Sequence, residues 1–402
     1  MNLLNEGIAQ NAVIKTAMTR KLTIDGITKP YPVYKVRLDW LFYNDQNDRI
    51  ATWMSKYKAQ HEGFAPDISN REEYNSIIEQ FIVESNPDAI KKTQTNIELV
   101  DQREAGVVLV DGRIIDGNRR FTCLRRLSKK NDRFNYFETV ILDRNFETSA
   151  KQIKMLELSI QHGEESKVDY APIDRLVGVY NDIVETKLLS EEEYAKSTNE
   201  SVGEVKKRVE LSKILVEFLE FINAPMQFYI ARDLQLYSSF EELHKLLKKC
   251  TTEDEKEDLK NSIFCNIIIE PMGDMARFIR KFKDVIGSDY QEEFMEEQRE
   301  LAEKTLELLP ESGKVTTSVI RDVLRANENL RGEMERSIEK ASEKVKKKET
   351  HNRPIQLAEK ATNALEDIDQ NIILKMNDSE LRRLDRQLDR LEKLLSEIRE
   401  NL

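Results

Sequence analysis

The residues best suited to chemistry lie in the stretch IDGNRRFTCLRRL, residues 115–127, where a glycine and two arginines follow a short apolar run. Gly117 stands where strand-like residues give way to apolar residues at helical spacing, which begin at Phe121. A helix N-terminus presents unpaired N–H groups and a positive partial charge, and glycine allows a ligand to approach the backbone closely. Arg119 and Arg120 in the first turn would complete a pocket for phosphate or pyrophosphate.

The same residues allow a simpler interpretation. The arginines could solvate the helix and pair with Asp111 or Asp116. Asp116 could hold a metal ion beside the phosphates, or it could form the turn and cap the helix through its side-chain oxygen. The spacing alone does not decide between these alternatives.

The elements around this stretch are predicted from residue type and spacing. Asp111-Gly112 favours a tight hairpin turn, and from residue 118 the pattern becomes helical. We expect two strands within 21–43, helices over 48–60 and 71–84, short strands at 107–110 and 113–115, and a strand at 136–142.

Beyond residue 147 the pattern predicts helices alone, with polar breaks near 163–169, 188, 198, 225 and 251. Between Leu381 and Leu402, apolar residues alternate at spacings of three and four, which is typical of a coiled-coil seam that self-associates or pairs within the chain. The lysine-rich segment 340–354 is either a linker or a solvated helix end. The predicted domains are 1–146, 147–225, 226–340 and 341–402, the last a linker with a coiled-coil helix.

Three collinear segments resemble the ParB/sulfiredoxin-like superfamily. IDGNRRFTCLRRL is similar to the Gly-Glu-Arg-Arg box of that family. Upstream, VRLDWLFYNDQNDRI (36–50) is similar to the first box, with Asn44, Gln46 or Asn47, and Arg49 at the matching positions. Downstream, LELSIQHGEESKVDYAPIDRLVGVYNDIV (156–184) is similar to the Glu-Asn-Ile-Gln-Arg box. The resemblance extends over roughly residues 30–225.

This resemblance implies an α+β nucleotide-binding domain followed by a mostly all-α region, with CTP or ATP as the ligand and Mg²⁺ as a possible companion. Carried over position by position, it implies that Asp116 and Ser159 orient the metal. The residues that would hold the nucleotide are Gly117, Asn118, Arg119, Arg120, Arg49, Gln161 and Ser159.

The chain also departs from the family pattern. Asn118 stands where ParB proteins carry the glutamate implicated in hydrolysis, and an amide cannot act as a general base. In the third box, Leu158 and Ser159 replace Glu-Asn, and His162 replaces the arginine. We therefore expect nucleotide binding with weak or absent hydrolysis. Sulfiredoxins need a cysteine at the position of Asn118, and Cys123 is expected to pack in the core.

Residues 188–215 are similar to the helix-turn-helix that follows in ParB proteins, with a turn at 198–200 and a second helix capped by Ser201. The second helix carries Lys206, Lys207 and Arg208 among glutamates. Such a mixed face could contact DNA or dock on a protein.

The composition limits the class of protein. The net charge is −11, so any polyanion must bind at a local patch. The three cysteines are scattered, and no apolar run reaches the length of a signal peptide or a membrane span, so we expect a cytoplasmic protein. The histidines lack metal-ligand spacing, so we expect no zinc site. The leading hypothesis is a dimeric, DNA-associated nucleotide switch. A nuclease or NTPase of a defence or mobile-element system and a non-catalytic scaffold are the alternatives, so enzymatic activity stays open.

Overall fold

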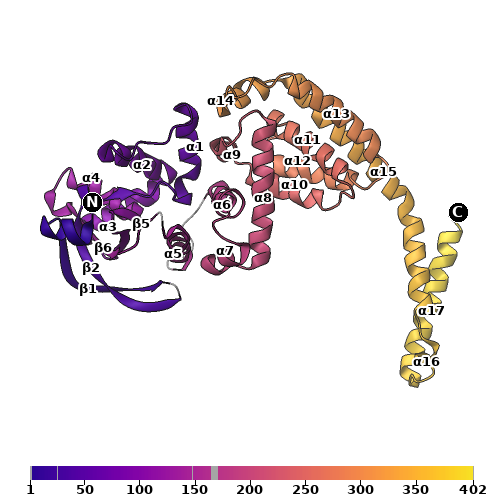
Figure 1. The fold of residues 1–402 in the computed structure, drawn as a ribbon. Helices are drawn as coiled ribbons and strands as arrows, with labels where there is room; N and C mark the ends of the chain where they lie inside the picture. Colours follow the sequence, from indigo (N-terminus) through magenta and orange to yellow (C-terminus); the bar gives the residue numbers. More distant parts are fainter. Residues whose placement is uncertain (1, 25, 147, 164–170, 402) are drawn as a thin grey trace. The chain divides into compact units, whose positions relative to one another are not determined.

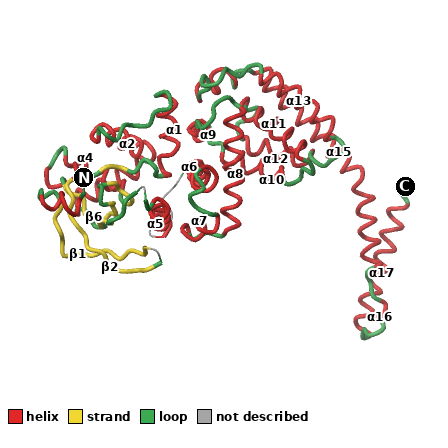
Figure 2. The backbone as a smooth tube through the Cα atoms, in the orientation of Figure 1, coloured by secondary structure: helices red, strands yellow, loops and turns green. Residues whose placement is uncertain are grey.

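The computed structural model describes residues 2–24, 26–146, 148–163 and 171–401 (Figure 1). The chain divides into two compact units, Met1–Ile338 and Glu339–Leu402. Within the described residues, strands occur only in the N-terminal part of the first unit, and the rest is almost entirely helical (Figure 2). This arrangement confirms the predicted order, a mixed α/β region followed by a helical remainder.

A mixed six-stranded sheet forms the N-terminal region, in the order β1-β2-β6-β4-β5-β3. The two long strands β1 and β2 form an antiparallel hairpin, whereas β4 pairs in parallel with β6 and antiparallel with β5. The strands are β1 (Val13–Ile24), β2 (Ile27–Arg37), β3 (Phe42–Tyr43), β4 (Gly106–Leu109), β5 (Arg113–Asp116) and β6 (Tyr136–Leu142).

The strand predictions differ from the structure mainly at β1. This strand begins at Val13, eight residues before the predicted start, and the register shifts between Lys15 and Thr19. It lies at the edge of the sheet, and most of its first half is exposed, so its sequence lacks the alternation of apolar and polar residues that marks a half-buried strand. β6 coincides with the predicted range 136–142.

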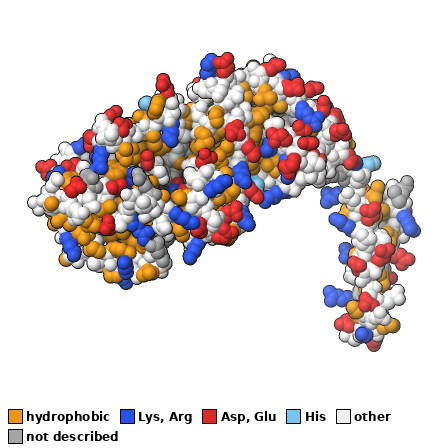
Figure 3. Space-filling model, in the orientation of Figure 1, with side chains coloured by type: hydrophobic (Ala, Val, Ile, Leu, Met, Phe, Trp, Pro, Cys, Tyr) orange, Lys and Arg blue, Asp and Glu red, His pale blue; other side chains and the backbone are white. Residues whose placement is uncertain are grey.

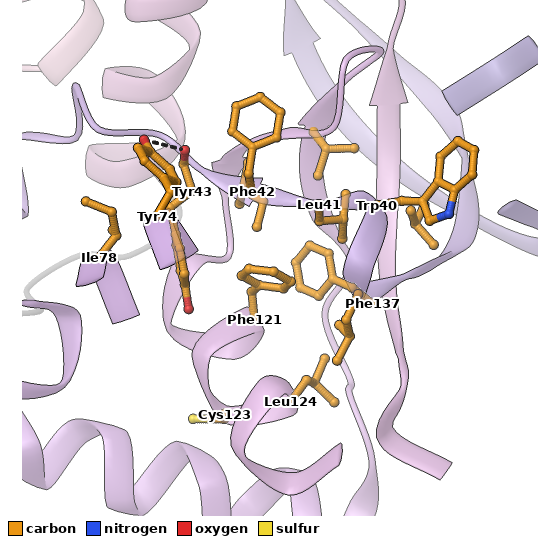
Figure 4. Close-up of a cluster of buried hydrophobic side chains, with 14 of the residues drawn as sticks. Trp40, Leu41, Phe42, Tyr43, Tyr74, Ile78, Phe121, Cys123, Leu124 and Phe137 are labelled. Carbon is orange, nitrogen blue, oxygen red and sulfur yellow. Dashed lines mark hydrogen bonds between the residues drawn. The ribbon is translucent and has the colours of Figure 1, made fainter. Parts of the chain in front are cut away.

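The central part of the sheet, around β4, is buried on both faces. Along β4, Val108 joins the core on one face, while Val107 and Leu109 join the core on the other, as strand alternation requires. In the first of these cores, Phe121 packs edge-on against Phe137, and both are fully buried (Figure 4). Replacing either ring by alanine would cost about 3–5 kcal/mol.

Trp40 and Cys123 belong to that same core, as the sequence predicts (Figure 4). Burial raises the pKa of the Cys123 thiol to about 12, so the reactive thiolate is suppressed. Trp53 packs at the margin of the core, and the guanidinium of Arg232 lies 3.8 Å from its ring centroid. All three residues therefore have packing roles.

Within the described residues, four α-helices lie between β3 and β6 in the sequence. α1 and α2 correspond to the predicted helices, but α3 was not predicted. Its signals are Asn86, whose side chain accepts a hydrogen bond from Ala89 N, and Pro87 at the first helical position. The helices are α1 (Ala51–Gln60), α2 (Arg71–Ser85), α3 (Pro87–Val100) and α4 (Asn118–Ser128), with short helical turns η1 (Leu3–Gly7), η2 (Leu38–Trp40), η3 (Asp48–Ile50) and η4 (Asp132–Phe134).

The helical part of the first unit packs around α8, which is buried along several sides. Most of the predicted break near 163–169 lies outside the described residues, and the other predicted breaks fall between helices. The helices are α5 (Ala150–Gly163), α6 (Pro172–Val179), η5 (Tyr180–Glu185), α7 (Glu191–Thr198), α8 (Val202–Phe221), α9 (Phe228–Asp233), α10 (Tyr237–Leu247), α11 (Glu253–Ile269), α12 (Met275–Val285), α13 (Gln291–Leu306), α14 (Thr317–Val319) and η6 (Ile320–Leu324).

The second unit is helical. α15 (Glu328–Glu366) crosses the boundary between the units and contains Pro354, so the segment 340–354 is helical. α16 (Gln370–Ile373) and α17 (Asp378–Arg399) follow. No residue of α17 is buried, and the predicted pairing of its leucine seam stays a prediction. None of the described helices is long and apolar enough to cross a membrane.

Candidate functional site

The site is built on the turn between β5 and α4. Gly117 has a φ of +98°, a left-handed conformation that favours glycine. A Cβ at this position would lie 2.8 Å from Phe137 Cζ and 3.3 Å from the guanidinium of Arg120. Gly117 therefore permits two close approaches as well as the turn itself.

The N-terminus of α4 has no side-chain cap. The helix begins at Asn118, its first backbone hydrogen bond runs from Phe121 N to Gly117 O at 2.9 Å, and its first turn carries no acidic residue. The early N–H groups of a helix need partners from outside the helix, and they favour an anion. The local backbone thus supplies the polar end that a phosphate requires.

An open cleft of about 980 Å³ lies over this turn, bounded by α3 and the N-terminus of α4. It brings together Arg49, Asp116, Gly117, Asn118, Arg119 and Arg120, so most of the residues predicted from two separate segments share one cavity. The basic side chains on its wall are Arg49, Lys91, Lys92, Arg103, Arg119 and Arg120, and the acidic ones are Asp88, Glu104 and Asp116. Basic groups therefore outnumber acidic groups by six to three.

Arg120 is held by two carboxylates within this cleft. Its Nη1 lies 2.6 Å from Glu104 Oε2, and its Nη2 lies 3.0 Å from Asp116 Oδ2. The pairing with Asp116 realises the simpler of the two interpretations of this arginine, yet the guanidinium still borders the cleft.

Asp116 anchors arginines rather than the helix. Its Oδ2 accepts a hydrogen bond from Arg20 Nη1 at 2.9 Å as well as from Arg120. No side chain caps α4, so the predicted capping role of Asp116 was wrong. Among the described residues, no group of three or more His, Cys, Asp or Glu side chains could hold a metal ion. A metal at Asp116 would need oxygen ligands from the nucleotide or from water.

Asn118 contributes an amide to the cleft wall. Its Oδ1 is buried and has no hydrogen-bond partner among the described residues. An unpaired buried acceptor is uncommon in folded proteins. The amide could accept a hydrogen bond from a ligand, but it cannot remove a proton from water.

Ser159 and Gln161 do not line the cleft. Both are on α5, where Ser159 Oγ donates to Leu156 O at 2.9 Å and Gln161 Nε2 donates to Glu157 Oε1 at 3.1 Å. Gln161 is 8% exposed. The third predicted box therefore packs against the second through Ile115 and Ile160, but these two polar side chains stay outside the cleft, and the side chain of His162 lies outside the described residues.

Instead, the third box borders a group of charged residues that we call the buried charge cluster: Asp48, Lys154, Glu157 and Asp182. Lys154 Nζ lies 2.6 Å from Asp48 Oδ1 and 3.4 Å from Asp182 Oδ2. All four residues are less than 9% exposed. The cluster joins η3 of the sheet region to α5 and η5 of the helical region.

Burial controls the protonation of this cluster. It raises the pKa of Glu157 to about 8 and that of Asp182 to about 7. Burial alone would lower the pKa of Lys154, but the neighbouring carboxylates, Asp48 first among them, more than reverse this and raise it well above its ordinary value. Lys154 thus pairs with Asp48 and Asp182, and its charge also acts on Glu157.

The predicted helix-turn-helix consists of α7 and α8. Asn199 at the turn has a φ of +55°, and the side chain of Ser201 accepts a hydrogen bond from Glu204 N, which confirms the predicted cap. The candidate DNA ligands all face carboxylates. Lys206 Nζ lies 3.8 Å from Glu191 Oε2.

The other two DNA candidates are held more closely. Lys207 Nζ lies 2.8 Å from Glu241 Oε1 on α10, and Arg208 makes two hydrogen bonds to Glu200, at 2.6 and 3.0 Å. The side chain of Arg208 is 13% exposed, whereas that of Lys206 is 58% exposed. Lys206 is therefore the most accessible of the three.

Sequence reasoning missed four basic residues at the site. Lys91 and Lys92 on α3 and Arg103 in the following loop line the cleft, and Arg20 from β1 reaches Asp116. The capping signal at Asn86 and Pro87 could have located α3 and its lysines. Nothing in the sequence pairs Arg20 with Asp116, which is 96 residues away.

The comparisons with known proteins add little. Neither a protein-family model nor a curated protein matches the sequence. One similar solved structure is the C2221 form of a Pnob8-like ParB-N domain, which is 14% identical and covers 69% of this chain and 98% of its own. Its TM-score is 0.27, so this likeness establishes neither the family nor the function of the chain.

Proposed function

We propose that the chain binds a nucleoside triphosphate, CTP or ATP, in the cleft at the N-terminus of α4. The observation that carries the proposal is the joint placement of an uncapped helix N-terminus, a glycine at φ +98° and an excess of basic side chains around one cleft. Each feature favours an anion, and their combination matches the several charges of a polyphosphate.

The phosphates would bind to backbone N–H groups at the start of α4 and to the guanidinium groups of Arg119 and Arg120, with Arg49 as a further cation on the wall. The lysines of α3 would face the outer part of the ligand. A bound Mg²⁺ would neutralise phosphate charge, with Asp116 as its protein ligand. Asn118 offers no general base, so we propose binding with slow or absent hydrolysis.

Calorimetric titration with CTP, ATP, GTP and UTP, with and without Mg²⁺, tests this proposal. Arg119→Ala should weaken binding by about tenfold or more, because it removes a charge-assisted contact. Arg126→Ala is the matched control, since Arg126 is exposed on the same helix outside the cleft. Equal affinities in wild type and Arg119→Ala would contradict the proposed site.

The proposal includes DNA association through α7 and α8, with Lys206 as the principal phosphate ligand. On the face drawn in Figure 3, acidic and basic side chains are interspersed along the helices, so binding would depend on few contacts. Lys207 and Arg208 would first have to leave Glu241 and Glu200.

Fluorescence anisotropy of a labelled duplex at increasing salt tests DNA association. Lys206→Ala should reduce the slope of log affinity against log salt by about one, as expected for the loss of one phosphate contact. Lys207→Ala should have a smaller effect. Absence of duplex binding at low salt would contradict this part of the proposal.

The proposal also includes self-association through α17. Its seam residues are half-buried or exposed, from 39% for Leu381 to 61% for Ile398, as expected for a surface that another helix covers. Light scattering should show a dimer for the full chain and a monomer for a chain that ends at residue 377. A full-length monomer would contradict this part.

A further inference from the structure

Two carboxylates contact Arg120, and they differ in their surroundings. The side chain of Asp116 is 12% exposed and also binds Arg20, so arginines from β1 and α4 both hold it in place. The side chain of Glu104 is 77% exposed, and it reaches Arg120 Nη1 at 2.6 Å. Glu104 therefore can leave Arg120 at low cost, whereas Asp116 cannot.

The backbone that carries Glu104 is fixed. Gln102 Nε2 donates hydrogen bonds to Glu104 O and Glu138 O, both at 2.7 Å, and Gln102 Oε1 accepts one from Glu138 N at 2.9 Å. These contacts attach the loop to β6 beside the cleft. Only the side chain of Glu104 is free to swing away, so exchange with a ligand needs no movement of the loop.

Arg120 presents a donor to the cleft at the point where Glu104 now binds. A carboxylate oxygen and a phosphate oxygen make the same kind of charge-assisted contact with a guanidinium. Glu104 and Arg120 both line the cleft, so a phosphate at this donor and the Glu104 carboxylate cannot both occupy the position.

We propose that Glu104 is an internal competitor for the ligand: its carboxylate occupies the Arg120 position that a ligand phosphate takes, and binding requires its displacement. This inference rests on the proposed polyphosphate site and adds the regulation of that site. It assigns opposite roles to the two carboxylates. Glu104 opposes binding, while Asp116 positions Arg120 and supports it.

The experiment is a calorimetric titration with inorganic tripolyphosphate in the absence of divalent cations. Glu104→Gln should tighten binding about three- to fivefold, which corresponds to the release of one partly exposed ion pair. Glu98→Gln on α3 is the matched control, because Glu98 is exposed and outside the cleft, and it should change the affinity by less than about 1.5-fold.

Two further variants separate competition at Arg120 from a general loss of negative charge. Asp116→Asn removes the same charge but should weaken binding about threefold, because Arg120 loses its anchor. In an Arg120→Gln background, Glu104→Gln should lose its effect, since the two residues act through one contact. Melting temperatures of the unliganded variants check that each one folds.

The outcomes are distinguishable. If wild type binds tripolyphosphate and Glu104→Gln binds it equally or more weakly, the inference is overturned and the proposed site stays intact. If Asp116→Asn increases the affinity for tripolyphosphate as much as Glu104→Gln does, the inference is also overturned, because the loss of negative charge alone would then explain both results. If neither wild type nor Glu104→Gln binds tripolyphosphate, both the proposed site and the inference are overturned. Binding by Glu104→Gln alone supports both.

Discussion

The cleft at α4 and the buried charge cluster are neighbours along the chain but have opposite properties. Asp48 and Arg49 are consecutive, yet Asp48 is sealed in the cluster against Lys154, while Arg49 lines the open cleft. In the cleft, charges lie near solvent and one partner, Glu104, is 77% exposed. In the cluster, all four groups are buried, and Lys154 pairs with Asp48 and Asp182.

This difference determines which charged side chains are available to a ligand. An exposed carboxylate of the cleft, such as Glu104, can give up its arginine to an anion at small cost, since exposed ion pairs contribute little. If a charged group of the cluster loses its partner, a buried charge is left uncompensated, which costs much free energy. We infer that the cleft serves binding and that the cluster fixes the sheet region against α5 and η5.

The largest expected effect comes from removing the central cation of the cluster. Lys154→Met should destabilise the protein by about 3–5 kcal/mol, because it leaves buried carboxyl groups without a partner. Urea unfolding monitored by circular dichroism measures the loss. Lys151→Met on the same helix removes a 43% exposed partner of Glu193 and should cost less than about 1 kcal/mol. Equal losses would show that the cluster has no special role.

A smaller effect is expected at the turn of the cleft. Gly117→Ala should destabilise the protein by about 1–3 kcal/mol, and it should also weaken tripolyphosphate binding, because the new Cβ meets Phe137 and Arg120. Gly63→Ala is a matched control: Gly63 has a φ of +88°, but a Cβ added there would meet nothing within 4 Å. Thermal melting and titration of both variants separate backbone strain from the close approach. Identical results would mean that only strain matters.

The contribution of Glu157 to the stability of the buried charge cluster depends on pH. Its pKa of about 8 in the folded state lies above the ordinary 4.5, so the folded protein binds a proton that the unfolded chain releases. This contribution to stability is complete below about pH 4.5 and is lost as the pH rises to 8. Glu157→Gln should therefore raise the Tm relative to wild type by roughly 2 °C or more at pH 9, with little effect at pH 5.

Scanning calorimetry across this pH range measures the difference. A Tm difference that does not grow with pH would show that Glu157 is already ionised in the folded protein at neutral pH. The side chain of glutamine keeps an acceptor for Gln161, so loss of that hydrogen bond does not confuse the result.

The smallest expected effect concerns Ser159. Because its hydroxyl donates within α5 and lies outside the cleft, Ser159→Ala should change nucleotide affinity by less than about twofold. Titration with the nucleotide that wild type prefers, with Mg²⁺ present, makes this comparison. A larger loss of affinity would show that the third box contributes to the binding site.

The sequence predicted the second box well, because the turn and the start of the helix are local events. Gly117 and the switch from alternating to helical spacing lie within a few residues of each other. It could not predict how distant segments meet. Arg20 reaches Asp116, and Arg49 shares the cleft with Arg120, only through tertiary packing, which no short-range pattern encodes.

Family resemblance also misplaced Ser159 and Gln161 relative to the cleft. Their spacing on a helix is compatible with a ligand site, but the burial of Gln161 beside Glu157 depends on packing across η3, α5 and η5. Burial of polar residues follows from tertiary contacts, and sequence periodicity alone does not reveal it. The lysines of α3 were missed for a different reason, since the helix itself was not predicted.

The most direct test of the central claim is a crystal structure of the protein with a bound nucleoside triphosphate. We predict phosphate density within hydrogen-bond distance of Arg119 and the first N–H groups of α4, with Arg120 released from Glu104 and still bound to Asp116. Phosphates bound elsewhere, with Arg120 still paired to Glu104, would contradict the assignment of this cleft as the binding site.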